Sequence, residues 1–508
     1  MQHVVSLCLT LALALCLALP ALAAEPRLGA GDTGTITLSG MEDGAGATAY
    51  KVIDVRYDYT ADSPEEPAYS WAAEAAAWVE TNFPDYIGAN GEVTKAYSEA
   101  GAEAMKALAD KMAAAIRAGG ITLGGTPASN NSLTGLAMGS YLILVEGGAK
   151  VYSPALVNVV PVWDQATESW TLPEQDLEVT VKASSLTLEK TADKAQAAVG
   201  DTVTYTLVAA VPQYPANATN KGYILSDKLP DGLTLGAVTV QGVAADGQET
   251  LLTDGTHYTK ATEGATRPDA ANTPVSFKLE FIYNQISSYS SIKVTYTATV
   301  NKDAVVTDGN VNNAYLDYNN DPYGDATWQT VADEKTVYTY GIQVKKTDGA
   351  DQPLSGAEFT LSTDEEGKDV IDFVGANGVY HKAEASETGA ATVAVDGEGN
   401  LTLSGLDVGT YYLTETKAPG GYNKLSAPIE ITITDAKNAN GDAAPDGIVD
   451  DEGATTGYVQ ATVVNTQGFV LPTTGGMGTA LFTIAGVVLM GASVLVLALF
   501  VRRRSSAK

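Results

Sequence analysis

Residues 403–415 read Leu-Ser-Gly-Leu-Asp-Val-Gly-Thr-Tyr-Tyr-Leu-Thr-Glu, and residues 133–145 read Leu-Thr-Gly-Leu-Ala-Met-Gly-Ser-Tyr-Leu-Ile-Leu-Val. The two stretches align without gaps, and in each a glycine-containing turn leads into a strand-like run. This internal echo indicates that two distant parts of the chain share a turn that feeds a core strand. One difference matters for chemistry: Val145 stands where the second copy has Glu415.

The same alternation of apolar and polar residues extends outward from both copies. Residues 185–338 and 339–470 carry repeated Thr/Val/Tyr alternation, which favours antiparallel β-sandwiches. Residues 24–184 begin and end with strand-like text, but the Ala-rich stretch from Trp71 to Arg117 predicts two helices with a break at 84–91. We therefore expect a mostly β protein with tandem Ig-like β-sandwich domains and helical insertions in the first domain.

The composition limits the function. The chain has 508 residues, with 61 Asp+Glu against 30 Lys+Arg and a net charge of −31, which argues against nucleic acid as a partner. The only cysteines are Cys8 and Cys16, and there are three histidines, which argues against a thiol enzyme, an ordinary zinc site or a disulfide scaffold. The acidic clusters at 317–325 and 442–451 lack the full spacing of an EF-hand, so no metal or cofactor is expected.

Both ends of the chain carry apolar segments. Residues 4–22 close with Ala21-Leu22-Ala23, which predicts a cleaved signal peptide over 1–23; the alternative is an N-terminal membrane anchor. Both cysteines lie in this segment. At the other end, Leu471-Pro472-Thr473-Thr474-Gly475 precedes an apolar run over 477–501, long enough to span a bilayer, and then Arg502-Arg503-Arg504.

The order of pentapeptide, apolar span and basic tail over 471–508 resembles the cell-wall sorting signal of Gram-positive surface proteins. The resemblance implies that a sortase cleaves between Thr474 and Gly475, holds Thr474 as a thioester and passes its acyl group to an amine. The alternative is a chance pentapeptide before a permanent membrane anchor.

Strand periodicity also places polar side chains on apolar faces. Each of the two later β segments has a lysine in its first strand, an acid in its middle and an asparagine in its last strand; these are Lys190, Asp227 and Asn312, and Lys346, Glu415 and Asn465. Burial lowers the pKa of a lysine and raises that of a carboxyl. A neutral amine can then attack an asparagine side chain that the protonated acid polarises, which expels ammonia and leaves an isopeptide bond. The alternative is a buried ion pair beside a hydrogen-bonded asparagine.

Two longer matches support this chemistry. Val344-Lys-Lys346-Thr-Asp-Gly, Leu413-Thr-Glu415-Thr-Lys-Ala-Pro-Gly-Gly-Tyr422 and Val463-Val-Asn465 resemble the collagen-adhesin B-type (prealbumin-like) sandwich of Gram-positive pilins. Residues 185–338, with Leu225-Ser-Asp227-Lys-Leu-Pro and Asn312-Asn-Ala-Tyr, are similar to the isopeptide-forming fimbrial domain. The resemblance implies a Lys190–Asn312 bond assisted by Asp227 and a Lys346–Asn465 bond assisted by Glu415. Asn313 is the alternative partner of Lys190, and Val145 predicts no such bond in the first domain.

Backbone pilins that this chain resembles use a lysine near the end of the first domain to attack the sortase-held threonine of another subunit. The matching text here is Val179-Thr-Val-Lys182-Ala-Ser184, in which the Tyr-Pro pair of the family is absent and Ser184 takes the family's lysine position. Lys182 is the best candidate and Lys150 a weaker one; the alternative is that Lys182 is a solvated surface lysine.

The resemblance therefore predicts a backbone pilin: a non-enzymatic structural subunit of surface fimbriae, exported, polymerised and anchored to the cell wall. The implied partners are pilus-type and housekeeping sortases, other copies of the chain, minor pilins, peptidoglycan and host surface molecules. A wall-anchored monomeric adhesin or a minor pilin shares every feature except a working acceptor lysine. A secreted hydrolase would need a substrate-cleaving constellation that the sequence does not show.

Overall fold

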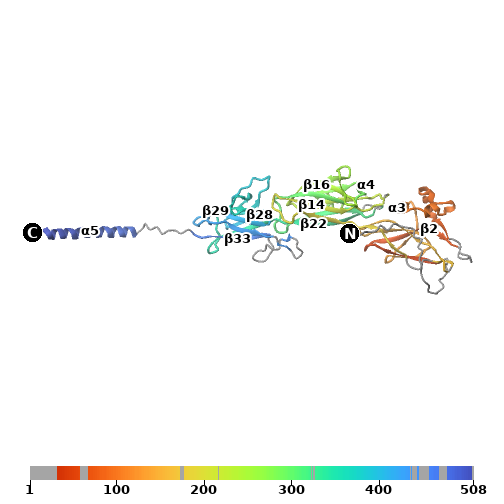
Figure 1. The fold of residues 1–508 in the computed structure, drawn as a ribbon, viewed down its shortest axis with the longest axis horizontal. Helices are drawn as coiled ribbons and strands as arrows, with labels where there is room; N and C mark the ends of the chain where they lie inside the picture. Colours follow the sequence, from red (N-terminus) through yellow and green to blue (C-terminus); the bar gives the residue numbers. More distant parts are fainter. Residues whose placement is uncertain are drawn as a thin grey trace. The chain divides into compact units, whose positions relative to one another are not determined.

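A computed structural model describes residues 31–57, 67–166, 168–171, 177–215, 217–321, 323, 327–434, 436–437, 443–444, 457–467 and 478–505. The chain forms two compact units, Met1–Thr339 and Tyr340–Lys508. The first unit contains two β regions, residues 31–184 and 185–339, and the second unit contains a third β region and a C-terminal helix (Figure 1). The mostly β fold expected from the sequence is confirmed.

The first β region combines two larger sheets and two two-stranded sheets with helices. Its strands are β1 (Thr33–Ser39), β2 (Gly46–Arg56), β3 (Ala68–Trp71), β4 (Gly125–Pro127), β5 (Ser132–Ala137), β6 (Gly139–Glu146), β7 (Val151–Tyr152), β8 (Ala155–Val159), β9 (Val162–Asp164), β10 (Ser169–Thr171), β11 (Leu177–Thr180) and β12 (Ala183–Ser184). One of the larger sheets has the order β3-β2-β6-β8, with β4 also paired to β2, and the other has the order β11-β1-β5.

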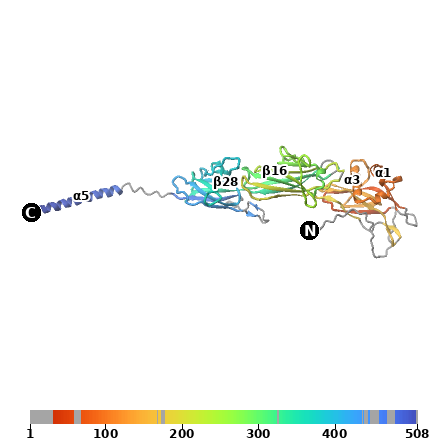
Figure 2. The ribbon, with the colours of Figure 1, turned by 45° about the horizontal axis from the view of Figure 1, so that its top comes forward.

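The predicted helices of this region are present (Figure 2). They are α1 (Ala73–Asn82) and α3 (Ala102–Arg117), separated by two short 3-10 turns (Pro84–Tyr86 and Ala89–Gly91) and by α2 (Lys95–Ser98). Val79 of α1 and Leu108 of α3 are buried in a core shared with Val52 of β2 and Leu142 of β6. The helices therefore cover one face of the β2–β6 sheet.

The second β region is a sandwich of two five-stranded sheets. Its elements are β13 (Leu188–Ala192), β14 (Thr202–Ala210), β15 (Tyr223–Lys228), β16 (Leu233–Val243), β17 (Glu249–Leu251), β18 (Tyr258–Ala261), β19 (Phe277–Phe281), α4 (Tyr283–Ile286), β20 (Ser291–Val300), β21 (Asn310–Asn319) and β22 (Trp328–Val337). The sheet orders are β13-β14-β20-β16-β17 and β18-β19-β15-β21-β22. Alternate side chains of β14, β20 and the first half of β21 are buried, as the period-two pattern predicts.

Side chains of the second β region contact backbone carbonyls and a side chain of the first. Asn217 Nδ2 donates to Asp110 O at the middle of α3 (2.9 Å), and Asn320 Nδ2 donates to Gly148 O (2.8 Å). The guanidinium of Arg117 lies 5.0 Å from the ring centroid of Tyr323. These contacts explain why residues 31–339 form a single compact unit rather than two.

The third β region places its first and last strands side by side. Its strands are β23 (Tyr340–Asp348), β24 (Glu358–Ser362), β25 (Phe373–Ala376), β26 (Val379–Lys382), β27 (Val393–Ala394), β28 (Asn400–Leu406), β29 (Gly409–Lys417), β30 (Ile429–Ile433), β31 (Ala436–Lys437), β32 (Ala443–Ala444) and β33 (Tyr458–Asn465). One sheet has the order β25-β26-β28-β23-β33 and the facing sheet has the order β27-β24-β29-β30. β23 and β33 are parallel.

The sequence echo corresponds to a structural repeat. β5 and β6 contain residues 133–145, and β28 and β29 contain residues 403–415. In each copy the tyrosine hydroxyl closes the turn on a carbonyl four residues earlier: Tyr141 donates to Ala137 O (2.5 Å) and Tyr411 donates to Asp407 O (2.8 Å). The neighbouring strands match as well. In the first region β1 is antiparallel to β5 and parallel to β11. In the third region β23 is likewise antiparallel to β28 and parallel to β33.

The C-terminal helix α5 covers Gly478–Ser505. Among the residues that the structure describes, no helix meets the combined length and hydropathy of a membrane-crossing helix. The span expected over 477–501 therefore stays a prediction. Residues 1–23 and 471–475, which hold the predicted signal peptide and sorting pentapeptide, lie outside the described residues.

Candidate functional site: two buried lysine–acid–asparagine sets

The third β region brings Lys346, Glu415 and Asn465 together. Lys346 of β23 is paired in register with Val463 of β33, so Asn465, two residues further along β33, shares its face of the sheet. Glu415 reaches the same place from β29 in the facing sheet. All three side chains are at most 1% exposed.

Hydrogen bonds fix the three groups but leave two oxygens without partners. Asn465 Nδ2 donates to Glu415 Oε2 (3.0 Å) and to the carbonyl of Asn423 (2.5 Å), while the backbone N–H of Leu425 also donates to Glu415 Oε2 (2.8 Å). Lys346 Nζ donates to Val463 O (3.0 Å). Glu415 Oε1 and Asn465 Oδ1 are buried and have no partner among the described residues.

The second β region brings Lys190, Asp227 and Asn312 together across its sandwich. Lys190 comes from β13 in one sheet, whereas Asp227 and Asn312 come from the neighbouring strands β15 and β21 of the other. All three are fully buried. Lys190 Nζ lies 2.5 Å from Asp227 Oδ2, and Asp227 Oδ1 and Asn312 Oδ1 have no partner among the described residues.

Burial favours the neutral form of both lysines and of Asp227. Burial lowers the pKa of Lys190 and of Lys346, and the neighbouring carboxylate opposes this shift in each case. Burial raises the pKa of Asp227 to about 6, although Lys190 acts in the opposite direction. A proton that moves from the ammonium to the carboxylate leaves an amine with a free electron pair beside a carboxylic acid.

The unpaired oxygens belong to the same two residues in both regions: the acid and the asparagine. Buried polar atoms without partners are rare in folded proteins. A carboxyl proton donated to the asparagine carbonyl would satisfy both atoms at once and would polarise that carbonyl. The arrangement is therefore suited to attack by the lysine on the asparagine side chain.

The sequence predicted these six residues, and the structure places them in two sets of three. Asn313, the alternative partner of Lys190, is half-exposed and lies on the opposite face of β21 from Asn312. A seventh residue, Tyr296 of β20, was missed by the sequence analysis. Its hydroxyl contacts Lys190, Asp227 and Asn312. The alternation Ile292, Val294, Tyr296 places its ring on the core face, which was the available signal.

The first β region lacks the set at all three positions. Ile36 pairs with Leu133 and Leu177 as Ile342 pairs with Leu403 and Val459, so Gly40, Val145 and Ala183 take the places of Lys346, Glu415 and Asn465. Gly40 has a φ of +82°, a backbone conformation in which a lysine would be strained. The prediction that this region forms no cross-link therefore rests on Gly40 and Ala183 as well as on Val145.

Lys182, the predicted acceptor lysine, is exposed and lies between β11 and β12. Its carbonyl accepts the N–H of Ser153 (2.9 Å), next to the pairing of β12 with β7, so the backbone on both sides of it is fixed. Lys150 is half-exposed, with its Nζ 3.5 Å from Gly40 O.

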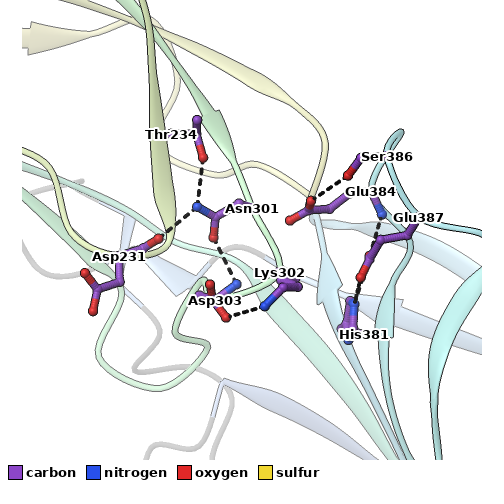
Figure 3. Close-up of polar contacts among 9 residues, drawn as sticks. All are labelled: Asp231, Thr234, Asn301, Lys302, Asp303, His381, Glu384, Ser386 and Glu387. Atoms are coloured by element: carbon purple, nitrogen blue, oxygen red, sulfur yellow. Dashed lines mark hydrogen bonds and ion pairs between the residues drawn. The ribbon is translucent and has the colours of Figure 1, made fainter.

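Polar groups elsewhere form ordinary turn contacts (Figure 3). In the second β region Asn301 Nδ2 donates to Asp231 O (2.8 Å) and Thr234 Oγ1 (3.0 Å). In the third, His381 Nε2 lies 3.0 Å from Glu387 Oε2. Within the described ranges, no group of three or more His, Cys, Asp or Glu side chains could hold a metal ion.

Three protein families match successive parts of the chain. Residues 199–322 match the Gram-positive pilin backbone subunit 2, Cna-B-like domain; residues 340–444 match the SpaA prealbumin-like fold domain; and residues 463–508 match the LPXTG cell wall anchor motif. The last match identifies the protein as an extracellular, cell-wall-anchored surface protein.

Individual proteins are also similar to this chain. The trypsin-resistant surface T6 protein of Streptococcus pyogenes serotype M6 is 28% identical over 255 residues, which cover 47% of this chain and 43% of the relative, so the match spans less than half of that protein. The solved structure of the T6 backbone pilin of the same serotype, described as a modular three-domain structure, aligns with a TM-score of 0.56 at 20% identity over 87% of this chain and 99% of that one. The full-length major pilin SpaD of Corynebacterium diphtheriae aligns over 87% and 99% at 18% identity, with a TM-score of 0.49. With matches to a pilin-backbone domain, a prealbumin-like domain and a wall anchor in one chain, this protein is similar to the LPXTG-anchored backbone pilins of Gram-positive bacteria.

Proposed function

We propose that the chain is the repeating subunit of a covalent surface fimbrium. A sortase joins Thr474 of one copy to Lys182 of the next, and a housekeeping sortase transfers the finished polymer to peptidoglycan. Minor pilins and host surface molecules are further partners expected of this role. The chain itself turns over no substrate; its own chemistry is a single self-cross-linking event in each of two β regions.

The cross-linking reaction balances without a cofactor. The neutral Nζ of Lys190 or Lys346 attacks Cγ of Asn312 or Asn465, a new C–N bond forms, and the bond from Cγ to Nδ2 breaks. One proton passes from Nζ to the departing nitrogen, which leaves as ammonia. Asp227 or Glu415 holds that proton and hydrogen-bonds the carbonyl while charge develops on its oxygen.

The observation that carries the proposal is the recurrence of one buried set in two different sheet arrangements. In the third region the lysine and asparagine lie on adjacent parallel strands, whereas in the second they lie in opposite sheets. The same three residue types and the same two unpaired oxygens nevertheless recur. A set kept only for packing would not require this, and replacing a buried ion pair by apolar residues is often neutral or stabilising.

Polymerisation is tested at Lys182. The Lys182→Arg variant keeps the positive charge but removes the nucleophilic amine, and Lys150→Arg is the matched control. Boiled cell-wall extracts in SDS are compared by immunoblot. We expect a high-mass ladder in the wild type and in Lys150→Arg, and a single band in Lys182→Arg.

Other outcomes distinguish the rival functions. A ladder lost only in Lys150→Arg would retain the fimbrium and move the acceptor. A single band in the wild type would contradict the backbone role and leave a wall-anchored adhesin or a minor pilin.

A further inference from the structure

The Tyr296 hydroxyl lies at the centre of the buried set of the second β region. It accepts hydrogen bonds from Lys190 Nζ (2.9 Å) and from Asn312 Nδ2 (2.9 Å), and it donates its own proton to Asp227 Oδ2 (2.8 Å). The side chain is 1% exposed. One hydroxyl thus contacts the nucleophilic nitrogen, the leaving nitrogen and the acid.

We propose that the Tyr296 hydroxyl is a catalytic residue of the Lys190–Asn312 cross-link and carries the proton that the leaving nitrogen of Asn312 must gain. The proposal rests on the cross-link proposed above. It assigns a fourth member to the set of the second β region.

The direction of the hydrogen bonds explains how the relay works. An amide nitrogen is a donor only, and in the structure Asn312 Nδ2 donates to Tyr296 Oη. Once Lys190 Nζ has added to Cγ, Nδ2 becomes an amine with a free electron pair and can accept. The hydroxyl then turns its proton from Asp227 to Nδ2 and takes a replacement proton from Nζ. The C–N bond to Nδ2 breaks, ammonia leaves, and the tyrosine is regenerated unchanged.

The third β region explains why only the second needs a tyrosine. There the acid itself contacts the leaving nitrogen, because Asn465 Nδ2 donates to Glu415 Oε2 (3.0 Å). In the second region the acid is aspartate, one methylene shorter, and no hydrogen bond joins Asp227 to Asn312 among the described contacts. Tyr296 bridges that gap, so Asp227 and Tyr296 together do what Glu415 does alone.

The chain offers a matched control. Tyr205 of β14 is paired with Tyr296 in the β14–β20 ladder, and their rings stack with centroids 5.3 Å apart. Its hydroxyl is equally buried but forms no hydrogen bond to Lys190 or Asp227. Tyr296→Phe and Tyr205→Phe therefore remove the same atom from the same aromatic layer, and only the first removes the proposed relay.

The experiment follows ammonia loss over time after cell-free synthesis of the full-length chain. Only molecules with a trypsin-resistant second β region are counted, so the readout covers folded protein even if a variant folds in lower yield. Peptide mapping by mass spectrometry assigns each loss to Lys190–Asn312 or to Lys346–Asn465. We expect Tyr296→Phe to slow the first bond by about 100-fold or more, the usual loss for a proton-transfer group, while Tyr205→Phe stays within about three-fold of wild type. The Lys346–Asn465 bond should form at the wild-type rate in both variants.

Two results would overturn the relay: a wild-type rate in Tyr296→Phe, or equal slowing in Tyr296→Phe and Tyr205→Phe, which would assign the effect to packing. Failure of the underlying cross-link is a separate result, because the wild-type chain would then show no ammonia loss at Lys190–Asn312 at any time.

Discussion

Replacing Lys346 by methionine removes the nucleophile of the third β region with little change in side-chain shape. The proposed bond to Asn465 closes a loop of about 120 residues. Loss of chain entropy in the unfolded state then stabilises the region by about 5 kcal/mol, on the loop-closure treatment used for disulfides. For a region of this size that corresponds to a drop in Tm of roughly 15–25 °C.

Methionine is chosen so that the cross-link is the main quantity lost. Lys346 is fully buried, and a methionine can fill that space without a charge. Lys345→Met is the matched control, because Lys345 is exposed and faces away from the core on the same strand.

Differential scanning calorimetry on the full chain measures the unfolding of the third region, and intact mass counts its bonds. The wild type and Lys345→Met should both be two ammonia molecules lighter than the sequence mass, and Lys346→Met only one. Equal Tm values for Lys346→Met and Lys345→Met, with equal ammonia loss, would refute the Lys346–Asn465 bond. Equal Tm values with the expected mass difference would instead refute the entropic estimate.

Three further predictions concern the second region and the polymer. Asn312→Ala should abolish ammonia loss at Lys190 whereas Asn313→Ala should not, because only Asn312 faces the core; peptide mapping decides, and the reverse result would move the bond to Asn313. Burial raises the pKa of Asp227 to about 6, so the initial rate of Lys190–Asn312 bond formation should fall as the pH is lowered through about 6. Below that pH Asp227 is already protonated from solvent and cannot accept the proton of Lys190, which stays a non-nucleophilic ammonium. A time course of ammonia loss from pH 5 to 8 tests this, and a rate that rises on acidification contradicts it. A protease site inserted after Gln165, in the turn between β9 and β10, separates Lys150 from Lys182. If Lys182 is the acceptor, the cut lies outside the path from Lys182 to Thr474, and the polymer should stay at high mass. If Lys150 is the acceptor, the cut breaks that path in every subunit, and the ladder should collapse to monomers.

Sequence periodicity located the six residues of the two sets because most of them lie in strands whose exposure alternates, although β15, which holds Asp227, is buried on both faces. Lys190 follows Leu188 on one face of β13, and Lys346 follows Ile342 and Val344 on one face of β23. A charged residue in phase with apolar ones is conspicuous in such a pattern. The gapless echo also located the turn shared by β5–β6 and β28–β29 correctly.

Periodicity did not find Tyr296, because an aromatic residue on a core face looks like ordinary packing. Its role depends on the contact of its hydroxyl with Lys190, Asp227 and Asn312. That contact is set by how the two sheets pack against each other, which the sequence does not show. Nor did the sequence show that Gly40 and Ala183 complete the loss of the set in the first region. That comparison requires the parallel register of β1 with β11, which joins residues about 140 apart in the chain.

The distribution of cross-links follows the covalent path that the proposed polymer would load. Tension would enter each subunit at Lys182 and leave at Thr474. Between these points the proposed bonds would join Lys190 of the first strand β13 to Asn312 of β21, the strand before the last, and Lys346 of the first strand β23 to Asn465 of the last strand β33. The expectation that Asn312 lies in the last strand of its region was wrong, because β22 follows β21. Each bond therefore keeps about 120 residues, or about 400 Å of extended chain, from unravelling under load. Residues before Lys182 lie off this path. A cross-link there would resist no tension, and in that region the equivalent positions hold Gly40, Val145 and Ala183. The lack of the set at these positions is therefore what a chain polymerised at Lys182 would require.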